Sequence, residues 1–159
     1  MKRVISTMNN AVSIRESVPD DIHSLSSSLR EPDRLEVLAS GSTPFEALTE
    51  SYKASTIRLS AFLNGKIIAM FGIAPKTILG ERAVIWLLTA PEVEQIKFSF
   101  VKLSKMYVKL FLERYPILEN WVDGRYTQAV KWLEILGAEF DLAQTLNGVE
   151  FHHFTIRRR

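Results

Sequence analysis

Residues 83–122 constrain the fold of this chain most, because they contain an apolar run, then a long amphipathic segment, then another short apolar segment. The run from Ala83 to Thr89 indicates a strand that is buried on both faces. From Pro91 to about Arg114, apolar residues recur at three- and four-residue steps, as on one buried helix face. Pro116 ends this helix, and Ile117 to Val122 is the next strand. We predict a right-handed crossover between two parallel strands over residues 83–122.

The rest of the chain alternates between helix-start signals and hairpin signals. Proline at the first helical position indicates helix starts, and Asn-Gly supplies the positive φ angles of a tight hairpin turn. The expected elements are a strand at 11–15, helices starting at Pro19, over 31–39 and from Pro44 to about Lys53, a hairpin of 58–63 and 66–73, a helix of about 124–136, and a hairpin of 138–145 and 149–157.

This order of elements predicts one α+β domain. Most neighbouring strands are joined by hairpins, so we expect a mixed, mostly antiparallel twisted sheet that is flanked by helices. The central crossover supplies its parallel pair. The chain shows no repeat, linker or low-complexity tract, so residues 11–159 are expected to form a single domain. Residues 1–10 are polar and unpatterned, and we expect a flexible N-terminal arm.

Composition excludes several classes of function. A formal charge of +2 is too small to indicate nucleic-acid binding, so none is expected. No apolar run approaches the roughly 18 residues of a membrane span, and no apolar stretch follows the N-terminal cations as in a secretory signal, so we expect neither membrane association nor secretion. Cysteine is absent. His152 and His153 are adjacent on a strand and face opposite sides, so no metal site is expected.

The order and spacing of several segments carry a resemblance, although none of them is a diagnostic motif alone. These segments are Phe45-Glu46-Ala47-Leu48, Phe71-Gly72-Ile73-Ala74-Pro75, Ile85-Trp86-Leu87-Leu88-Thr89, Tyr115-Pro116-Ile117-Leu118-Glu119-Asn120 and Trp132-Leu133-Glu134-Ile135-Leu136-Gly137. With them, the chain resembles the GNAT N-acetyltransferase superfamily across about residues 12–156, and more closely the GNAT-like proteins of tailed bacteriophages, which include the internal virion protein A of short-tailed phages.

The resemblance implies an acyl-CoA site whose diphosphate is held by a glycine-rich loop before the long helix, because bare N–H groups and a helix N-terminus bind phosphate. The matching segment, Thr89 to Lys97, has no glycine, and it contains a proline and the carboxylates of Glu92 and Glu94. We therefore expect no cofactor. If acetyl-CoA does bind, backbone groups around residues 90–95 must replace the loop. The contacting residues would be Leu88, Thr89, Ala90, Glu94 and Gln95.

The resemblance also implies a catalytic acid and a base. This chain has Leu133 where family members commonly have a tyrosine acid, and leucine cannot donate a proton. Tyr126 is the candidate replacement, although it is about two helical turns away. Glu119 and Asp123, on or after the strand 117–122, are the candidate bases. The interpretation that we favour is plainer: Asp123 is a helix N-cap, and Glu119 is a polar residue at a strand edge.

Two hypotheses follow. In the first, the chain is a non-catalytic GNAT-fold protein of a bacteriophage, in the particle or the bacterial host cytoplasm. It would act as a structural or assembly component of the virion, or it would bind other phage or host proteins. The protein could also form a homo-oligomer. In the second, it is an N-acyltransferase that uses acetyl-CoA through an atypical site. The missing glycine loop and Leu133 favour the first hypothesis.

Overall fold

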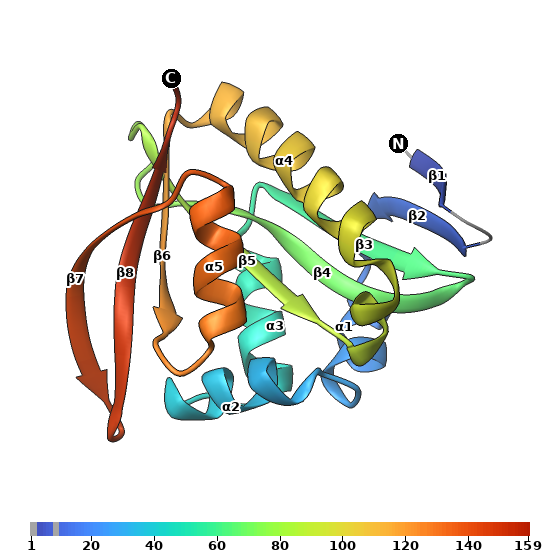
Figure 1. The fold of residues 1–159 in the computed structure, drawn as a ribbon, viewed down its shortest axis with the longest axis horizontal. Helices are drawn as coiled ribbons and strands as arrows, with labels where there is room; N and C mark the ends of the chain where they lie inside the picture. The colour runs from blue at the N-terminus through green and yellow to red at the C-terminus, as the bar shows by residue number, and fades with distance from the viewer. Residues whose placement is uncertain (1–2, 8–9) are drawn as a thin grey trace.

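An eight-stranded mixed sheet runs through the molecule, with helices on both faces (Figure 1). The computed structural model describes residues 3–7 and 10–159. The strands are β1 (Arg3–Thr7), β2 (Asn10–Glu16), β3 (Ile57–Leu63), β4 (Lys66–Pro75), β5 (Arg82–Thr89), β6 (Ile117–Asp123), β7 (Glu139–Leu146) and β8 (Val149–Arg157). The helices are α1 (Pro19–Ser26), α2 (Glu31–Ala39), α3 (Pro44–Ala54), the 3₁₀ helix η1 (Pro91–Ile96), α4 (Lys97–Arg114) and α5 (Thr127–Ile135).

The sheet has the strand order β1-β2-β3-β4-β5-β6-β8-β7. β5 and β6 pair in parallel, and the other neighbours pair antiparallel. The predicted fold class, an α+β arrangement with a mostly antiparallel sheet and a central strand-helix-strand crossover, is therefore confirmed. The long helix connects the two strands of the parallel pair, as the sequence predicts.

Each face of the sheet has its own apolar core. α4 and α5 cross one face and α1 to α3 cover the other (Figure 1). Ile73, Phe111 and Leu118 are buried in the core under α4 and α5. Leu25 and Met70 are buried in the core on the opposite face. Burial of one such side chain contributes about 1.5–3 kcal/mol, so the two cores fix which helix lies on which face.

The local signals in the sequence set most element boundaries. Asn64 and Gly65 form the tight turn between β3 and β4 with φ angles of 50° and 85°. α2 has the predicted bounds, and the Thr43 side chain caps α3 by accepting from the Glu46 N–H at 3.2 Å. α1 starts at Pro19 as predicted, with Val18 as its N-cap residue, and the Asp21 carboxylate accepts from the Val18 N–H at 2.9 Å.

The long helix begins differently from the prediction. Residues 91–96 form the 3₁₀ helix η1, and the α-helix starts at Lys97. Ile96, at the junction, has φ −128° and ψ 35°, which is not helical. The tighter η1 turn keeps Val93 and Ile96 buried while the chain leaves the end of β5. No helix in the described part of the chain is long and apolar enough to cross a membrane.

The expected N-terminal arm, residues 1–10, remains a prediction for most of its properties. Residues 1–2 and 8–9 lie outside the described residues. Arg3–Thr7 has a regular structure that was not predicted: it forms β1 and pairs with β2 in the register Arg3 to Ile14. Apolar and polar residues do not alternate along this segment, so its sequence did not predict a strand.

Candidate functional site

The strands β5 and β6 separate part of the way along their length. Their parallel register joins Arg82–Val84 to Ile117–Glu119 and then ends. At the point of separation, the Asn120 amide donates to the Ile85 carbonyl at 2.6 Å. Beyond it the strands diverge toward Thr89 and Asp123, and we call this diverging half the fork. The fork leaves backbone groups that a paired strand would have satisfied.

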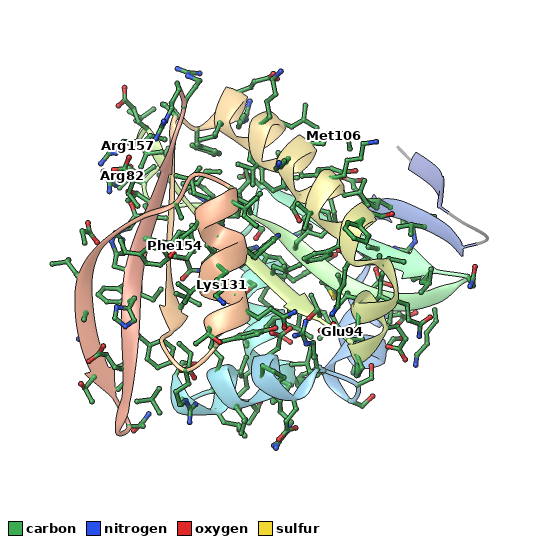
Figure 2. The ribbon with its side chains drawn as sticks, viewed as in Figure 1. Arg82, Glu94, Met106, Lys131, Phe154 and Arg157 are labelled. Atoms are coloured by element: carbon green, nitrogen blue, oxygen red, sulfur yellow. The ribbon has the colours of Figure 1, made fainter. Side chains whose placement is uncertain are left out.

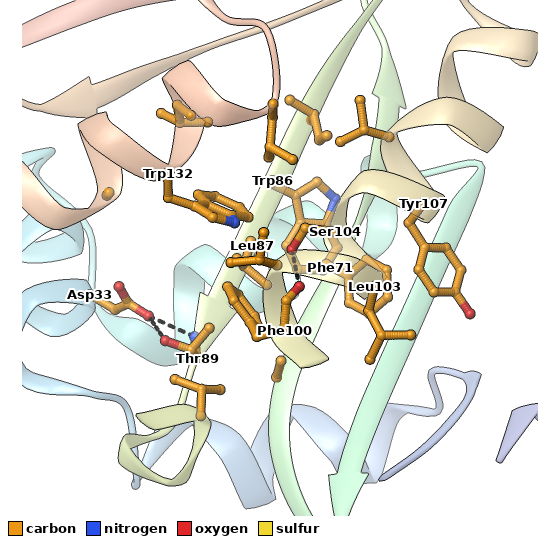
Figure 3. Close-up of a pocket in the computed structure, with 18 of the residues that line it drawn as sticks. Asp33, Phe71, Trp86, Leu87, Thr89, Phe100, Leu103, Ser104, Tyr107 and Trp132 are labelled. Atoms are coloured by element: carbon orange, nitrogen blue, oxygen red, sulfur yellow. Dashed lines mark hydrogen bonds between the residues drawn. The ribbon is translucent and has the colours of Figure 1, made fainter. Parts of the chain in front are cut away.

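Two carboxylates of α2 occupy the fork. Asp33 accepts hydrogen bonds from the backbone N–H of Thr89, at 2.7 Å, and from its hydroxyl (Figure 3). Glu36 accepts from the backbone N–H of Asp123 at 2.9 Å. The two residues are three positions apart and share one face of the helix. Asp33 therefore satisfies the end of β5 and Glu36 satisfies the end of β6.

A cavity of about 420 Å³ lies over the fork, between α4 and α5. It falls within the range of small-molecule sites. Leu87, Phe100 and Trp132 line its apolar part (Figure 3). Its polar lining comes from Arg30, Asp33, Glu36, Thr89, Glu94, Lys97, Asn120, Tyr126, Gln128 and Lys131. The cavity is thus an apolar slot with a charged end at the fork.

One of the residues that line this cavity, Trp132, has a buried hydrogen-bond donor without a partner in the part of the chain that the structure describes. The indole Nε1 of Trp132 is buried and has no hydrogen-bond partner among the described residues. A buried donor without a partner costs about 1–3 kcal/mol. Trp132 therefore contributes its apolar ring to the cavity, and its N–H is enclosed by the protein.

The acids at the fork hold protons more tightly than usual. Burial raises the pKa of Glu36 to about 7, and the neighbouring carboxylates of Asp33 and Asp123 add to the effect, against the hydrogen bond from the Asp123 N–H. Burial also raises the pKa of Asp33, although hydrogen bonds from Thr89 oppose it. The hydroxyl of Tyr126 hydrogen-bonds to Asp33, and burial followed by that negative charge raises its pKa. Tyr126 therefore stays protonated at neutral pH.

The mouth of the cavity at η1 is crossed by ion pairs. Arg30 Nη2 lies 2.8 Å from Glu94 Oε1, and Lys97 Nζ lies 3.1 Å from Glu94 Oε2. Arg30 also donates to Gln128 of α5 and lies over the Tyr126 ring, 5.4 Å from its centroid. Its guanidinium therefore connects the α4 side of the cavity to the α5 side.

The five residues predicted for a cofactor site are only partly brought together. Thr89 and Glu94 line the cavity. Leu88 is buried in the core on the opposite face of the sheet. The Ala90 N–H donates to the Ile68 carbonyl at 2.8 Å, so it is not available to a phosphate. Gln95 is exposed and does not line the cavity.

The three predicted catalytic residues lie in different surroundings. Tyr126 lines the cavity. Asp123 is buried beside the fork and accepts from the Arg125 backbone and guanidinium, so burial, which alone would raise its pKa, is outweighed and the pKa is lowered. It does not form the N-cap of α5, which is Tyr126. Leu133, at the position of the family's acid, is buried in the core.

Glu119 lies outside the cavity, at the paired end of β5 and β6. It is not at a strand edge, since β6 lies between β5 and β8. It is 6% exposed. Lys76, at 2.9 Å, and Arg82 form ion pairs with it, and His153 Nε2 lies 3.3 Å away. Burial alone would raise the pKa of Glu119, but the hydrogen bonds from these three partners lower it to about 2.

The sequence did not point to Arg30, Asp33 or Glu36. All three are in or beside a short helix whose composition is ordinary for a solvated surface. Their role depends on the fork, which forms between strands more than fifty residues away in the sequence. Within residues 3–7 and 10–159, no three His, Asp or Glu side chains gather into a group that could hold a metal ion.

No protein-family model matches the chain, and no curated protein matches it. Solved structures do. The spermidine N-acetyltransferase of Vibrio cholerae in complex with CoA and spermine has a TM-score of 0.67 and 16% identity, with 92% of this chain and 95% of that chain covered.

Two further structures agree with this likeness. AAC(6')-Ib in complex with ribostamycin and coenzyme A has a TM-score of 0.68 and 17% identity, covering 92% of this chain and 93% of that chain. A GNAT-family acetyltransferase from Bacillus anthracis has a TM-score of 0.68 and 9% identity, covering 92% and 94%. At these identities the likeness establishes the GNAT fold, and nothing in the comparisons links the chain to phage virion proteins.

Proposed function

We propose that this protein is an N-acyltransferase that takes its acyl group from a CoA thioester bound in the cavity over the fork. The fork carries the proposal: β5 and β6 separate to open a slot of about 420 Å³ with an apolar lining and a charged end. The apolar lining around Leu87, Phe100 and Trp132 would hold the pantetheine chain. Structures of the same fold in complex with CoA support this choice of ligand.

The backbone at the fork supports an acyl-transfer site. Along the edge of β5 that faces β6, the Ile85 carbonyl accepts from the Asn120 amide, and the Thr89 N–H donates to the Asp33 carboxylate. Leu87 lies between them, and strand alternation turns its N–H toward the same edge. The register with β6 ends before Leu87, and this residue lines the cavity. Its N–H is therefore placed to donate to an acyl carbonyl, as an oxyanion donor does.

The side chains at the fork supply a base and an acid. A bound CoA thioester would provide an activated carbonyl and a thiolate leaving group. Glu36, with its pKa of about 7, would accept the proton of the attacking amine as the new C–N bond forms. Tyr126, protonated at neutral pH, would donate its proton to the departing sulfur. The carboxyl groups of Asp33 and Glu36 would accept hydrogen bonds from an amine acceptor, and the N-acetyltransferases of similar fold support an amine acceptor.

A titration with CoA tests this proposal. We expect calorimetry to give a dissociation constant in the micromolar range for the wild-type protein. Ala129→Phe places an aromatic ring in the cavity lining and should weaken binding more than tenfold. The control Glu134→Phe places the same ring on the exposed side of α5, outside the lining, and should bind normally. No binding at millimolar CoA by the wild-type protein would refute the proposal.

A second candidate function is a non-catalytic one, as a structural, assembly or partner-binding protein of a bacteriophage. The observation in its favour is the start of the long helix, where the Ala90 amide is already bonded and Glu92 and Glu94 repel phosphate. This candidate predicts that CoA does not bind. Its particle role would be tested by detecting the protein in purified virions.

A further inference from the structure

We propose that Arg30 binds the diphosphate of the CoA group, and that the Glu94 carboxylate occupies the diphosphate position in the ligand-free protein. This inference rests on the proposed function, because it concerns the mouth of the same cavity. The fold lacks a glycine-rich phosphate loop at residues 89–97. An anionic ligand therefore needs a cation from another element, and Arg30 is supplied by the turn before α2.

The first step of the argument is where Arg30 is fixed. Its backbone N–H donates to the Thr89 carbonyl at 2.8 Å, which holds the residue at the end of β5. Its side chain is 16% exposed and lines the cavity. The guanidinium is therefore partly desolvated and faces a ligand that enters from the η1 side, where its charge acts more strongly than at an open surface.

The second step is what Arg30 contacts now. The Glu94 carboxylate lies between two cations from different elements, 2.8 Å from Arg30 and 3.1 Å from Lys97. A carboxylate bound by a planar guanidinium has the charge and hydrogen-bond geometry that a phosphate also presents. Glu94 thus marks an anion position at the mouth of the cavity.

The third step is how this position can be freed. The Glu94 side chain is 38% exposed, and η1 is a short 3₁₀ turn. An ion pair of that exposure is worth little, so a diphosphate with higher charge can replace it. Glu92, on the same turn, is committed to Lys66 and does not contact Arg30. The replacement therefore concerns one carboxylate and two cations.

The test measures the binding of two ligands, CoA and pantetheine, which lacks the diphosphate. Glu94→Gln should tighten CoA binding about fivefold, because the competing charge is removed. Arg30→Met, which keeps the apolar stem, should weaken CoA binding about tenfold. Neither substitution should change pantetheine binding by more than about twofold. Glu31→Gln is the matched control, because it removes a carboxylate beside Arg30 that pairs with Arg34 outside the cavity.

The outcomes separate the inference from the function on which it rests. If CoA binds the wild type, Glu94→Gln and Arg30→Met equally, the diphosphate lies elsewhere and the inference is wrong while the acyltransferase proposal stands. Equal effects on CoA and pantetheine also overturn it, since Arg30 would then act on the cavity itself. If CoA binds the wild type, binds Glu94→Gln more tightly and binds Arg30→Met more weakly, with pantetheine binding unchanged, the inference is supported. If neither ligand binds any of the proteins, both proposals fail.

Discussion

The two ends of the β5–β6 pair hold carboxylates, a buried one and a half-buried one, whose pKa values move in opposite directions. At the paired end, which we call the closed end, the pKa of Glu119 falls to about 2. At the fork, the pKa of Glu36 rises to about 7. Figure 2 shows how far apart the two ends are, with Arg82 near the closed end and Glu94 near the fork.

The partners of each carboxylate explain the difference. Glu119 has two cations and a histidine around it. Glu36 has a backbone N–H as its hydrogen-bond partner and two other carboxylates nearby. Burial alone would raise the pKa in both places, so the local charges decide the sign. The closed end therefore keeps a fixed charge that holds strands together, whereas the fork keeps a proton that can be exchanged near neutral pH.

The largest expected effect is on stability, at the closed end. Glu119→Ala should lower the free energy of unfolding by about 3 kcal/mol, because Lys76, Arg82 and His153 lose a shared buried partner. Urea denaturation would measure it. Glu139→Ala is the control, since that carboxylate is 65% exposed and pairs loosely with Arg159 at 3.4 Å, and it should change stability by less than about 0.5 kcal/mol. Equal losses of unfolding free energy in the two variants would show that the ion pairs of Glu119 do not stabilise the closed end.

The next effect is on catalysis, at the fork. Glu36→Gln should lower kcat/KM for acetyl transfer to an amine about a hundredfold, because the general base is lost. In the wild type, kcat/KM should rise with pH around a midpoint near 7, where Glu36 loses its proton. The variant should lack that rise. Assays of thiol release from acetyl-CoA would follow both, and an unchanged pH profile in Glu36→Gln would exclude this residue as the base.

The smallest effect is the pH dependence of stability that the fork imposes. The folded pKa of Glu36, about 7, lies above its reference value of 4.5, so the folded state binds the extra proton between these values. Stability contributed by the protonated carboxyl is complete below about pH 4.5 and is lost as the pH rises through 7. The wild type should lose about 2.5 kcal/mol relative to Glu36→Gln between pH 5 and pH 8, the linkage expected for a pKa that moves from 4.5 to about 7. Chemical denaturation at both pH values measures this, and parallel curves would contradict it.

Much of the fold could be predicted from the sequence because its signals are local. The Asn64-Gly65 turn, the Thr43 cap and the apolar run of β5 each determine structure within a few residues. The start of the long helix could not be predicted to the residue, because the 3₁₀ turn depends on how Val93 and Ile96 pack under the sheet. Pattern alone does not distinguish the two helix types.

The candidate site was much less predictable. Tyr126, Thr89 and Glu94 were proposed from their sequence positions and line the cavity. Glu119 was proposed as a base, and its environment became clear only with its partners from the β4–β5 loop, β5 and β8. Asp33 and Glu36 meet strand ends that are distant in the sequence. Such residues are identified by which backbone groups they satisfy, and this information appears only in three dimensions.

The short register between β5 and β6 has a mechanical consequence. In the described part of the chain, three residue pairs join the two strands directly, and beyond them the Asn120 side chain and the two α2 acids bridge the gap. The sheet therefore consists of two parts, β1 to β5 and β6 to β8, which are joined by backbone pairing over only a short length. The width of the opening between them is set by the lengths of an asparagine, an aspartate and a glutamate side chain.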